Sequence, residues 1–241
     1  MKHLLLTASL LLSLSLPARA AGAAGFLSGD EHLEYSIRHS RLPGNVGTMV
    51  FQGTRKGADY NLTAQLDVSI AGLYSLNSLY TADFRSDGNL TPLKASRDYK
   101  EKKYWAKSFY NWTAPGTVNI DVSKSSRPQR VETLTAPGTI RDLLNLLWWL
   151  RTCDYDAPDG IKTPESAVLL DHDLLPVRIA SVKKSTARYK GETVPVFEVS
   201  LSQDGKNMLQ ITLTDDARRT PLKFSIAFSF GTIRGNLAAV S

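Results

Sequence analysis

The sequence holds a single cysteine, Cys153, among its 241 residues. One cysteine excludes a disulfide within the chain, so the fold depends on its hydrophobic core for stability. A cysteine nucleophile needs a neighbouring base to activate it, and no base stands at a recognisable spacing from Cys153. We expect this side chain to be a small apolar group at the end of a helix.

Histidine is nearly as scarce, with four copies. Asp171, His172 and Asp173 put three possible metal ligands in a row, but adjacent side chains point apart and zinc ligands usually come from spaced positions. The sequence also has no serine-nucleophile elbow, phosphate-binding glycine loop, zinc-protease helix or dinucleotide-binding fingerprint. We therefore predict no catalytic residue, no metal site and no cofactor.

The N-terminus has the pattern of a secretory signal peptide. Lys2 opens it, residues 4–16 form an apolar run, and Pro17 breaks that run before Ala18-Arg19-Ala20. Small residues at these last positions are what a signal peptidase requires, and the run is shorter than the ~20 apolar residues of a membrane span. We predict cleavage near Ala20, a mature domain over residues 21–241, a periplasmic location and no membrane span after signal removal.

Strong charge of either sign is missing as well. Without Lys2 and Arg19 the chain has 27 basic residues against 23 acidic ones, a net charge of about +4. Like charges form no long block, because Glu101 interrupts the lysines at 100–103. We therefore expect no nucleic acid partner, whereas a weakly basic face suits anionic lipid headgroups or acidic glycans.

Period-two alternation of apolar and polar residues dominates the rest of the chain. Residues 61–70 are the clearest example, with apolar side chains at every second position from Leu62 to Ile70. Turns with glycine at residues 87–89, 190–192 and 204–206 separate alternating segments, as in β-hairpins. We predict a mainly β fold: a single curved antiparallel sheet of roughly ten strands, which forms an open half-barrel because sheet twist accumulates.

One segment has helical periodicity instead. Ile140, Leu144 and Trp148 recur at helical spacing within an apolar stretch, and Thr139 with Asp142 resembles a capping box. We predict a helix over about 139–152, covered by the concave face of the sheet because it is apolar on most sides. A long loop over about 154–175 follows, and such a loop in a compact domain is either functional or disordered.

Two stretches resemble a known family. Asp142-Leu-Leu-Asn-Leu-Leu-Trp-Trp-Leu-Arg151, and the segment from Leu213-Thr-Asp-Asp-Ala-Arg-Arg-Thr-Pro-Leu222 to Phe230-Gly-Thr-Ile-Arg-Gly-Asn-Leu237, are similar to the helix motif and C-terminal signature of exported bacterial proteins catalogued as a domain of unknown function. The resemblance implies a periplasmic protein. It also implies an architecture like that of the lipoprotein carriers LolA and LolB, which hold acyl chains on the concave face of a half-barrel. It supplies no catalytic residues.

Aromatic side chains are the best candidates for a ligand site. They crowd one predicted hairpin, at Tyr104 and Trp105 among others, and Trp148 and Trp149 follow on the helix. Trp149 lies on the polar arc of the helix, where a large apolar side chain needs a lid loop, a ligand or another protein as partner. With Arg151, which can meet a headgroup, these residues form our candidate ligand-binding set.

Three functions remain open from the sequence. The leading one is a periplasmic carrier that holds an amphipathic small molecule or lipid in the concave face. The second is a lyase or hydrolase acting on an acidic envelope or extracellular polysaccharide, since aromatic residues stack on sugars and lysines attract acidic ones. The third is an interaction scaffold for an envelope protein partner, with Trp149 and the 154–175 loop as interface.

Overall fold

A computed structural model describes residues 25–70, 74–156, 166–170, 172–228 and 231–241. Within these ranges the chain forms one sheet of fifteen strands and a single α-helix, α1 (Leu143–Leu150), preceded by a short 3-10 helix, η1 (Gly25–Ser28). The predicted signal peptide, residues 1–20, lies outside the described residues.

The strands follow one another along the sheet almost in chain order. They are β1 (Glu31–His39), β2 (Gly47–Lys56), β3 (Asp59–Ile70), β4 (Tyr74–Arg85), β5 (Pro92–Glu101), β6 (Tyr104–Ala114), β7 (Thr117–Lys124), β8 (Arg127–Thr135), β9 (Thr139–Asp142), β10 (Ser166–Leu170), β11 (Asp173–Tyr189), β12 (Glu192–Gln203), β13 (Lys206–Thr214), β14 (Pro221–Phe228) and β15 (Gly231–Val240). The spatial order runs from β8 down to β1, continues with β15 and descends to β9.

The expected fold class is confirmed as a mainly β single sheet, but two of its details need correction. The described residues hold fifteen strands rather than roughly ten, and β9 pairs with β10 in parallel in an otherwise antiparallel sheet. The period-two alternation of the sequence did not indicate strands β8, β9 and β10. In β8 almost every side chain is exposed, so it lacks the apolar alternation by which a strand is recognised.

Turn chemistry explains two of the hairpins. Lys190-Gly191 and Asp204-Gly205 have positive φ at both positions, which is the backbone of a two-residue type I′ turn. The turn after Asp87 differs from the prediction, because Leu90 rather than Gly88 has positive φ. Leu90 is fully buried there, and its carbonyl accepts hydrogen bonds from the side chains of Arg141 and Asn145.

The sheet curls until its two edge strands approach each other at one end. The amide of Ala136 donates to the carbonyl of Gly116, and the amide of Ile140 donates to that of Pro115. The indole nitrogen of Trp112 donates to the carbonyl of Ile140 at 2.8 Å. These bonds tie β9 to the β6–β7 turn, so the sheet is nearly closed into a barrel at this end rather than forming an open half-barrel.

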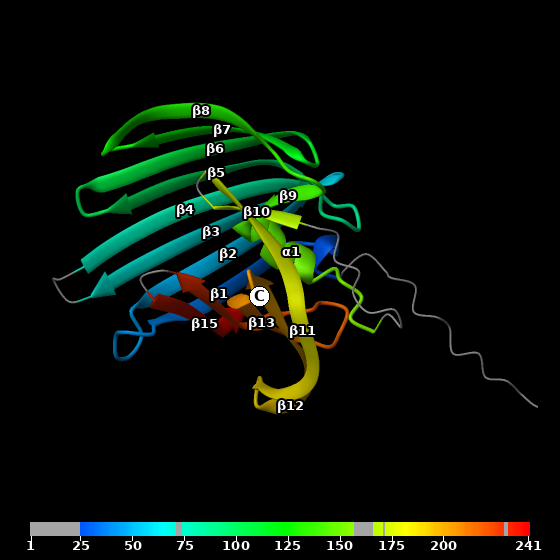
Figure 1. The fold of residues 1–241 in the computed structure, drawn as a ribbon. Coiled ribbons are helices and arrows are strands. Elements are labelled where there is room, and N and C mark those ends of the chain that lie inside the picture. The colour runs from blue at the N-terminus through cyan, green and yellow to red at the C-terminus, as the bar shows by residue number, and fades with distance from the viewer. Residues whose placement is uncertain (1–24, 71–73, 157–165, 171, 229–230) are drawn as a thin grey trace, which may run out of the picture.

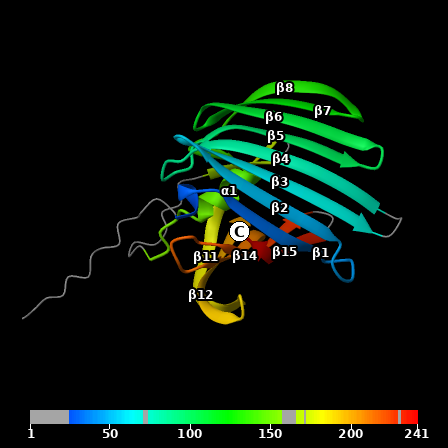
Figure 2. The same cartoon turned by 180° about the vertical axis from the view of Figure 1, so that it is seen from behind.

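The helix lies inside this curved sheet. Both views of the ribbon place α1 between the broad layer of β2 to β8 and strand β11 (Figure 1, Figure 2). Seven of its eight residues, all except Leu143, are buried. Its expected position against the concave face is therefore what the structure shows.

The helix is shorter than the expected range of about 139–152. Asp142 is its N-cap, and the Asp142 carboxylate accepts hydrogen bonds from the amides of Leu144 and Asn145 at 2.8 and 3.0 Å. Thr139 is not part of a capping box, because residues 139–142 form β9 and pair with β10. The expected loop over about 154–175 is also shorter, since β10 and the start of β11 occupy part of it.

Candidate functional site

The C-terminal end of α1 is fixed by a buried ion pair. Both terminal nitrogens of the Arg151 guanidinium donate to the Glu31 carboxylate, at 2.6 and 2.7 Å. The same guanidinium donates to the carbonyls of Arg218 and Arg219 and stacks on the ring of Phe26, 3.8 Å from its centroid. All three nitrogens of the Arg151 guanidinium thus donate to groups of the protein, and the side chain is inaccessible to solvent.

A second buried arginine fixes the N-terminal end of the helix. Arg141 donates to the side chain of Asn145 and to the carbonyls of Asn89 and Leu90, at 2.6, 2.9 and 3.2 Å. Burial lowers the pKa of Arg141 to about 10, so the side chain keeps its charge at neutral pH. Its guanidinium lies 4.7 Å from the ring of Trp149. This cation–π contact is the partner that Trp149 needed on the polar arc of the helix.

The two helix tryptophans belong to the packed core. Trp148 contacts Phe51, with the ring centroids 5.1 Å apart, and Trp149 is only 6% exposed. Three of the predicted ligand-binding residues, Trp148, Trp149 and Arg151, therefore lie together at the helix but face protein groups rather than an open cavity.

The cysteine after the helix has no features of a nucleophile. Burial raises the pKa of the Cys153 thiol to about 12, so the thiol is protonated at neutral pH, whereas the thiolate is the reactive form. Tyr155 uses its hydroxyl to donate to the carbonyl of Leu150 at 2.5 Å. Among the described residues, no three His, Cys, Asp or Glu side chains converge as metal ligands.

The sheet's inner face, the side that faces α1, is covered unevenly along its strands. On β3, Tyr60, Leu62 and Ala64 are fully buried, whereas further along the same face Leu66, Val68 and Ile70 are partly exposed. Met49 of β2 pairs with Leu66 and is also partly exposed. We call Met49, Leu66, Val68 and Ile70 the apolar strip. It marks where the sheet extends beyond the helix.

The predicted hairpin aromatics separate onto opposite faces of the sheet. The side chain of Tyr104 follows the parity of buried Ala106 and Tyr110, and its ring lies 5.9 Å from that of Tyr99 on β5. Trp105 has the other parity and is 41% exposed on the outer face. Tyr104 thus lies on the inner face of the sheet. Trp105 lies on the outer face, apart from the other predicted ligand-binding residues.

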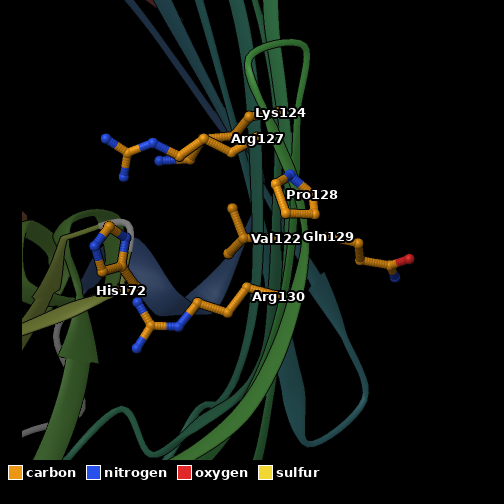
Figure 3. A pocket seen from close by; sticks show the side chains of 7 residues that line it. All are labelled: Val122, Lys124, Arg127, Pro128, Gln129, Arg130 and His172. Atoms are coloured by element: carbon orange, nitrogen blue, oxygen red, sulfur yellow. The ribbon is translucent and has the colours of Figure 1, made fainter.

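A cleft of about 320 Å³ opens between the edge strands β7 and β8 and the β10–β11 turn. Its polar lining includes Lys124, Arg127, Arg130 and His172, which we call the basic cleft. Figure 3 shows Lys124, Arg127 and Arg130 extending toward His172 from across the gap, while Gln129 points away. Buried Val122 contributes an apolar floor.

The basic cleft and the apolar strip lie on the same face of one continuous sheet. Leu66 pairs with Ser78 across β3 and β4, and the row continues through Tyr99 and Ala106 to Lys124 on β7. A neighbouring row runs from Tyr80 to Val122 and Arg130; its members are Tyr80, Arg97, Ser108, Val122 and Arg130. Along these two rows Leu66 lies on β3 and Lys124 and Arg130 lie on β7 and β8, with Tyr80, Tyr99 and Arg97 on the strands between them.

Sequence reasoning did not find the basic cleft. Its polar side chains come from a hairpin and from a turn at least 42 positions later, and only the curl of the sheet brings them together. The available signal was weak: Lys124, Arg127 and Arg130 stand close in sequence on strands with little apolar character.

The fold and this face define a β-barrel-like protein whose single sheet encloses a helix and has partly exposed apolar side chains on its inner face. The chain belongs to the DUF3108 family, described as proteins of unknown function, whose model matches residues 34–238. This confirms the resemblance that the helix motif and the C-terminal segment indicated.

A solved structure supports the fold assignment. The chain is similar to a β-barrel-like protein of another domain of unknown function, DUF1849, from Brucella abortus, with a TM-score of 0.58. The two share 11% sequence identity, and the similarity covers 88% of this chain and 97% of that one. No curated protein matches the sequence. In the ranges that the structure describes, no helix is long and apolar enough to cross a membrane.

Proposed function

We propose that this protein is a periplasmic carrier that binds an amphipathic ligand, a lipid or the acyl chain of an envelope component, on the inner face of its sheet. The observation that carries the proposal is the loss of cover along β3. Apolar side chains that point inward are buried beside α1 and partly exposed beyond it, at Leu66, Val68 and Ile70.

The position of the binding surface differs from the one expected around the helix. The two buried arginines hold α1 at one end of the barrel, and α1 fills that end. We therefore assign the apolar part of the ligand to the apolar strip. Each methylene that the strip covers contributes about 0.8 kcal/mol. The tyrosines next to the strip, Tyr80, Tyr99 and Tyr104, combine apolar rings with polar hydroxyls, which suits a ligand that changes polarity along its length.

The periplasmic location rests on the N-terminal pattern of residues 1–20. A cleaved signal predicts that the protein recovered from an envelope fraction begins near Ala21. N-terminal sequencing of that protein tests the location, and an N-terminus at Met1 in the cytoplasmic fraction contradicts it.

The binding proposal is tested with palmitoyl lysophosphatidylcholine, a soluble single-chain probe without net charge. Isothermal titration calorimetry is expected to show saturable binding to the delipidated protein with a negative heat-capacity change, the mark of apolar burial. Leu66→Asn is expected to weaken this binding. No binding of the probe by the folded protein contradicts the proposal.

Leu79 provides the matched control. It lies on β4, pairs with Gln65 and points to the outer face, where it is exposed. Leu79→Asn changes the same side chain in the same way, on the opposite side of the sheet. Equal weakening by Leu66→Asn and Leu79→Asn contradicts the assignment of the ligand to the inner face.

A further inference from the structure

The outer face of the sheet carries exposed aromatic side chains. Trp105 and Phe109 of β6 are 41% and 57% exposed, and both alternate along the strand with residues of the inner face. Val131 of β8 is 71% exposed. It shares the outer face, because Asp121 of β7 pairs with both Phe109 and Val131. Strands β4 to β8 lie side by side (Figure 2), and their outer face is opposite to the face that carries the apolar strip.

These apolar side chains do not join into one patch. Lys107 stands between Trp105 and Phe109 along β6. Asp121 stands between Phe109 and Val131 across the strands. A bilayer or a protein partner favours a contiguous apolar patch. Aromatic rings set apart by polar groups suit a ligand whose own apolar faces are separated by polar groups, and the sugar rings of a polysaccharide are such faces.

The polar groups beside Phe109 match the rim of a sugar ring. The next row on the same face consists of exposed amides and a hydroxyl: Asn111, Asn119 and Thr133. An asparagine side chain offers both donors and an acceptor, and so does a hydroxyl. A pyranose ring presents C–H groups on its faces and hydroxyls that donate and accept around its rim. The outer face thus offers a partner to both parts of the ring.

The spacing of the two aromatic rings favours an extended chain. Trp105 and Phe109 lie on the same side of one strand, four residues and about 13 Å apart at roughly 3.3 Å per residue. A straight chain of sugars along β6 therefore meets each aromatic side chain with a different ring. Lys107, between them, already has a counter-charge in Asp98 at 3.2 Å, so the ligand need not bring an acidic group to this point.

We propose that the outer face around β6 binds a neutral polysaccharide with β-1,4 linkages. Equatorial β-1,4 linkages make a straight chain whose rings expose their C–H faces. Trp105 and Phe109 each stack on one sugar ring, and Asn111 and Asn119 bind hydroxyls beside them. This second site lies on the opposite side of the sheet from the proposed lipid site and does not depend on it.

The test uses cellohexaose and chitohexaose, which share the linkage but contain glucose and N-acetylglucosamine respectively. Titration with at least one of them is expected to give a saturable change in tryptophan fluorescence, because Trp105 is the most exposed of the four tryptophans. The hexasaccharide that binds more tightly identifies the sugar. Maltohexaose, whose α-linked chain curls, is expected to bind about tenfold more weakly, since it cannot meet both rings. No response to either β-linked probe, or equal binding of maltohexaose, overturns the inference.

Calorimetry with the better probe then tests the residues. Trp105→Ala and Phe109→Ala are each expected to weaken binding about fivefold, whereas Trp105→Phe keeps a flat ring and is expected to retain most of the affinity. Leu79→Ala is the matched control, since Leu79 is an exposed apolar residue on the outer face of β4. Each variant is checked for an unchanged melting temperature. Wild-type affinity in both alanine variants of the aromatic residues, or an equal loss in Leu79→Ala, contradicts the assignment.

Two further measurements separate the polysaccharide from other occupants of this face. Wild-type protein and Trp105→Ala are compared in cosedimentation with phosphatidylcholine vesicles and in sedimentation equilibrium. The two proteins are expected to behave alike in both. If Trp105→Ala abolishes binding to vesicles or dissociates a dimer, the face contacts a bilayer or a second copy of the chain, and the polysaccharide assignment is wrong.

Discussion

Arg151 and Glu31 lie 120 positions apart in the sequence and form a two-pronged ion pair inside the barrel, with nitrogen–oxygen distances of 2.6 and 2.7 Å. The pair joins the end of α1 to the start of β1, the strand at the middle of the sheet order. Because Phe26 and Trp148 flank the guanidinium at 3.8 and 5.1 Å, the contact is shielded from water. It ties the C-terminal end of the helix to the sheet.

Removing one member of this pair is expected to be strongly destabilising. Arg151→Met leaves the Glu31 carboxylate buried without a counter-charge, a situation that costs about 3–5 kcal/mol. Urea unfolding followed by tryptophan fluorescence is expected to show this loss in the free energy of unfolding. The double variant E31M/R151M removes both charges and is expected to recover part of the loss, so the two substitutions are not additive.

Arg178→Met is the control for this prediction. Arg178 lies on β11 with an exposed side chain, and surface substitutions usually change stability by less than about 0.5 kcal/mol. If Arg151→Met costs no more than Arg178→Met, the ion pair does not fix the helix.

The N-cap of α1 is expected to make stability depend on pH. Burial raises the pKa of Asp142 from its ordinary 3.8 to about 6, so the folded protein binds this proton more tightly than the unfolded chain does. The contribution of Asp142 is therefore full below about pH 4 and is lost as the pH rises through about 6, by about 3 kcal/mol.

Asp142→Asn isolates this effect. Asparagine is an equally good N-cap residue but has no ionisable group, so the stability of the variant relative to the wild type is expected to rise between about pH 4 and about pH 7. Urea midpoints measured at both pH values test this. A constant difference between the two proteins across that range contradicts the raised pKa.

The sequence predicted the parts of the fold that local patterns encode. The alternation of apolar residues on β3 predicted the strand and which of its side chains face inward. The spacing of Leu144 and Trp148 predicted the helix. Both patterns are visible in the sequence because they record which side chains face the core. The start of the helix was misplaced because Thr139 pairs with Ser166 of β10, 27 positions further along the chain. Strand β8 was missed because its side chains are exposed on both faces.

The functional surface was less predictable for a related reason. The need of Trp149 for a partner was recognised, but Arg141 satisfies it only because the carbonyls of Asn89 and Leu90 hold the guanidinium in place. The basic cleft depends on the curl of the whole sheet. Both are contacts between distant segments, and no pattern within a single element indicates them.

Cys153 is expected to react with thiol reagents only after unfolding. With its pKa raised by burial from 9.0 to about 12, the thiolate population of the folded protein falls about a thousandfold, because each unit of pKa is a factor of ten. Labelling with Ellman's reagent is therefore expected to be very slow in buffer and fast in urea. The variant C153S/S181C moves the thiol to an exposed position on β11 and is expected to label quickly when folded; equally fast labelling of folded wild-type protein contradicts the raised pKa of Cys153.

Tyr104 and Trp105 are neighbours in sequence, and the sheet gives them opposite roles in the proposed binding surface. Tyr104 lies on the inner face beside Tyr99, whereas Trp105 is exposed on the outer face. Tyr104→Ala is expected to weaken binding of palmitoyl lysophosphatidylcholine about fivefold, since the lost apolar contact is worth about 1 kcal/mol. Trp105→Ala is expected to leave the affinity unchanged while removing the most solvent-accessible of the indoles that the structure describes, so acrylamide quenching of the remaining fluorescence falls. A loss of affinity in Trp105→Ala with none in Tyr104→Ala would place the ligand on the outer face, and the inner-face carrier would have to be abandoned.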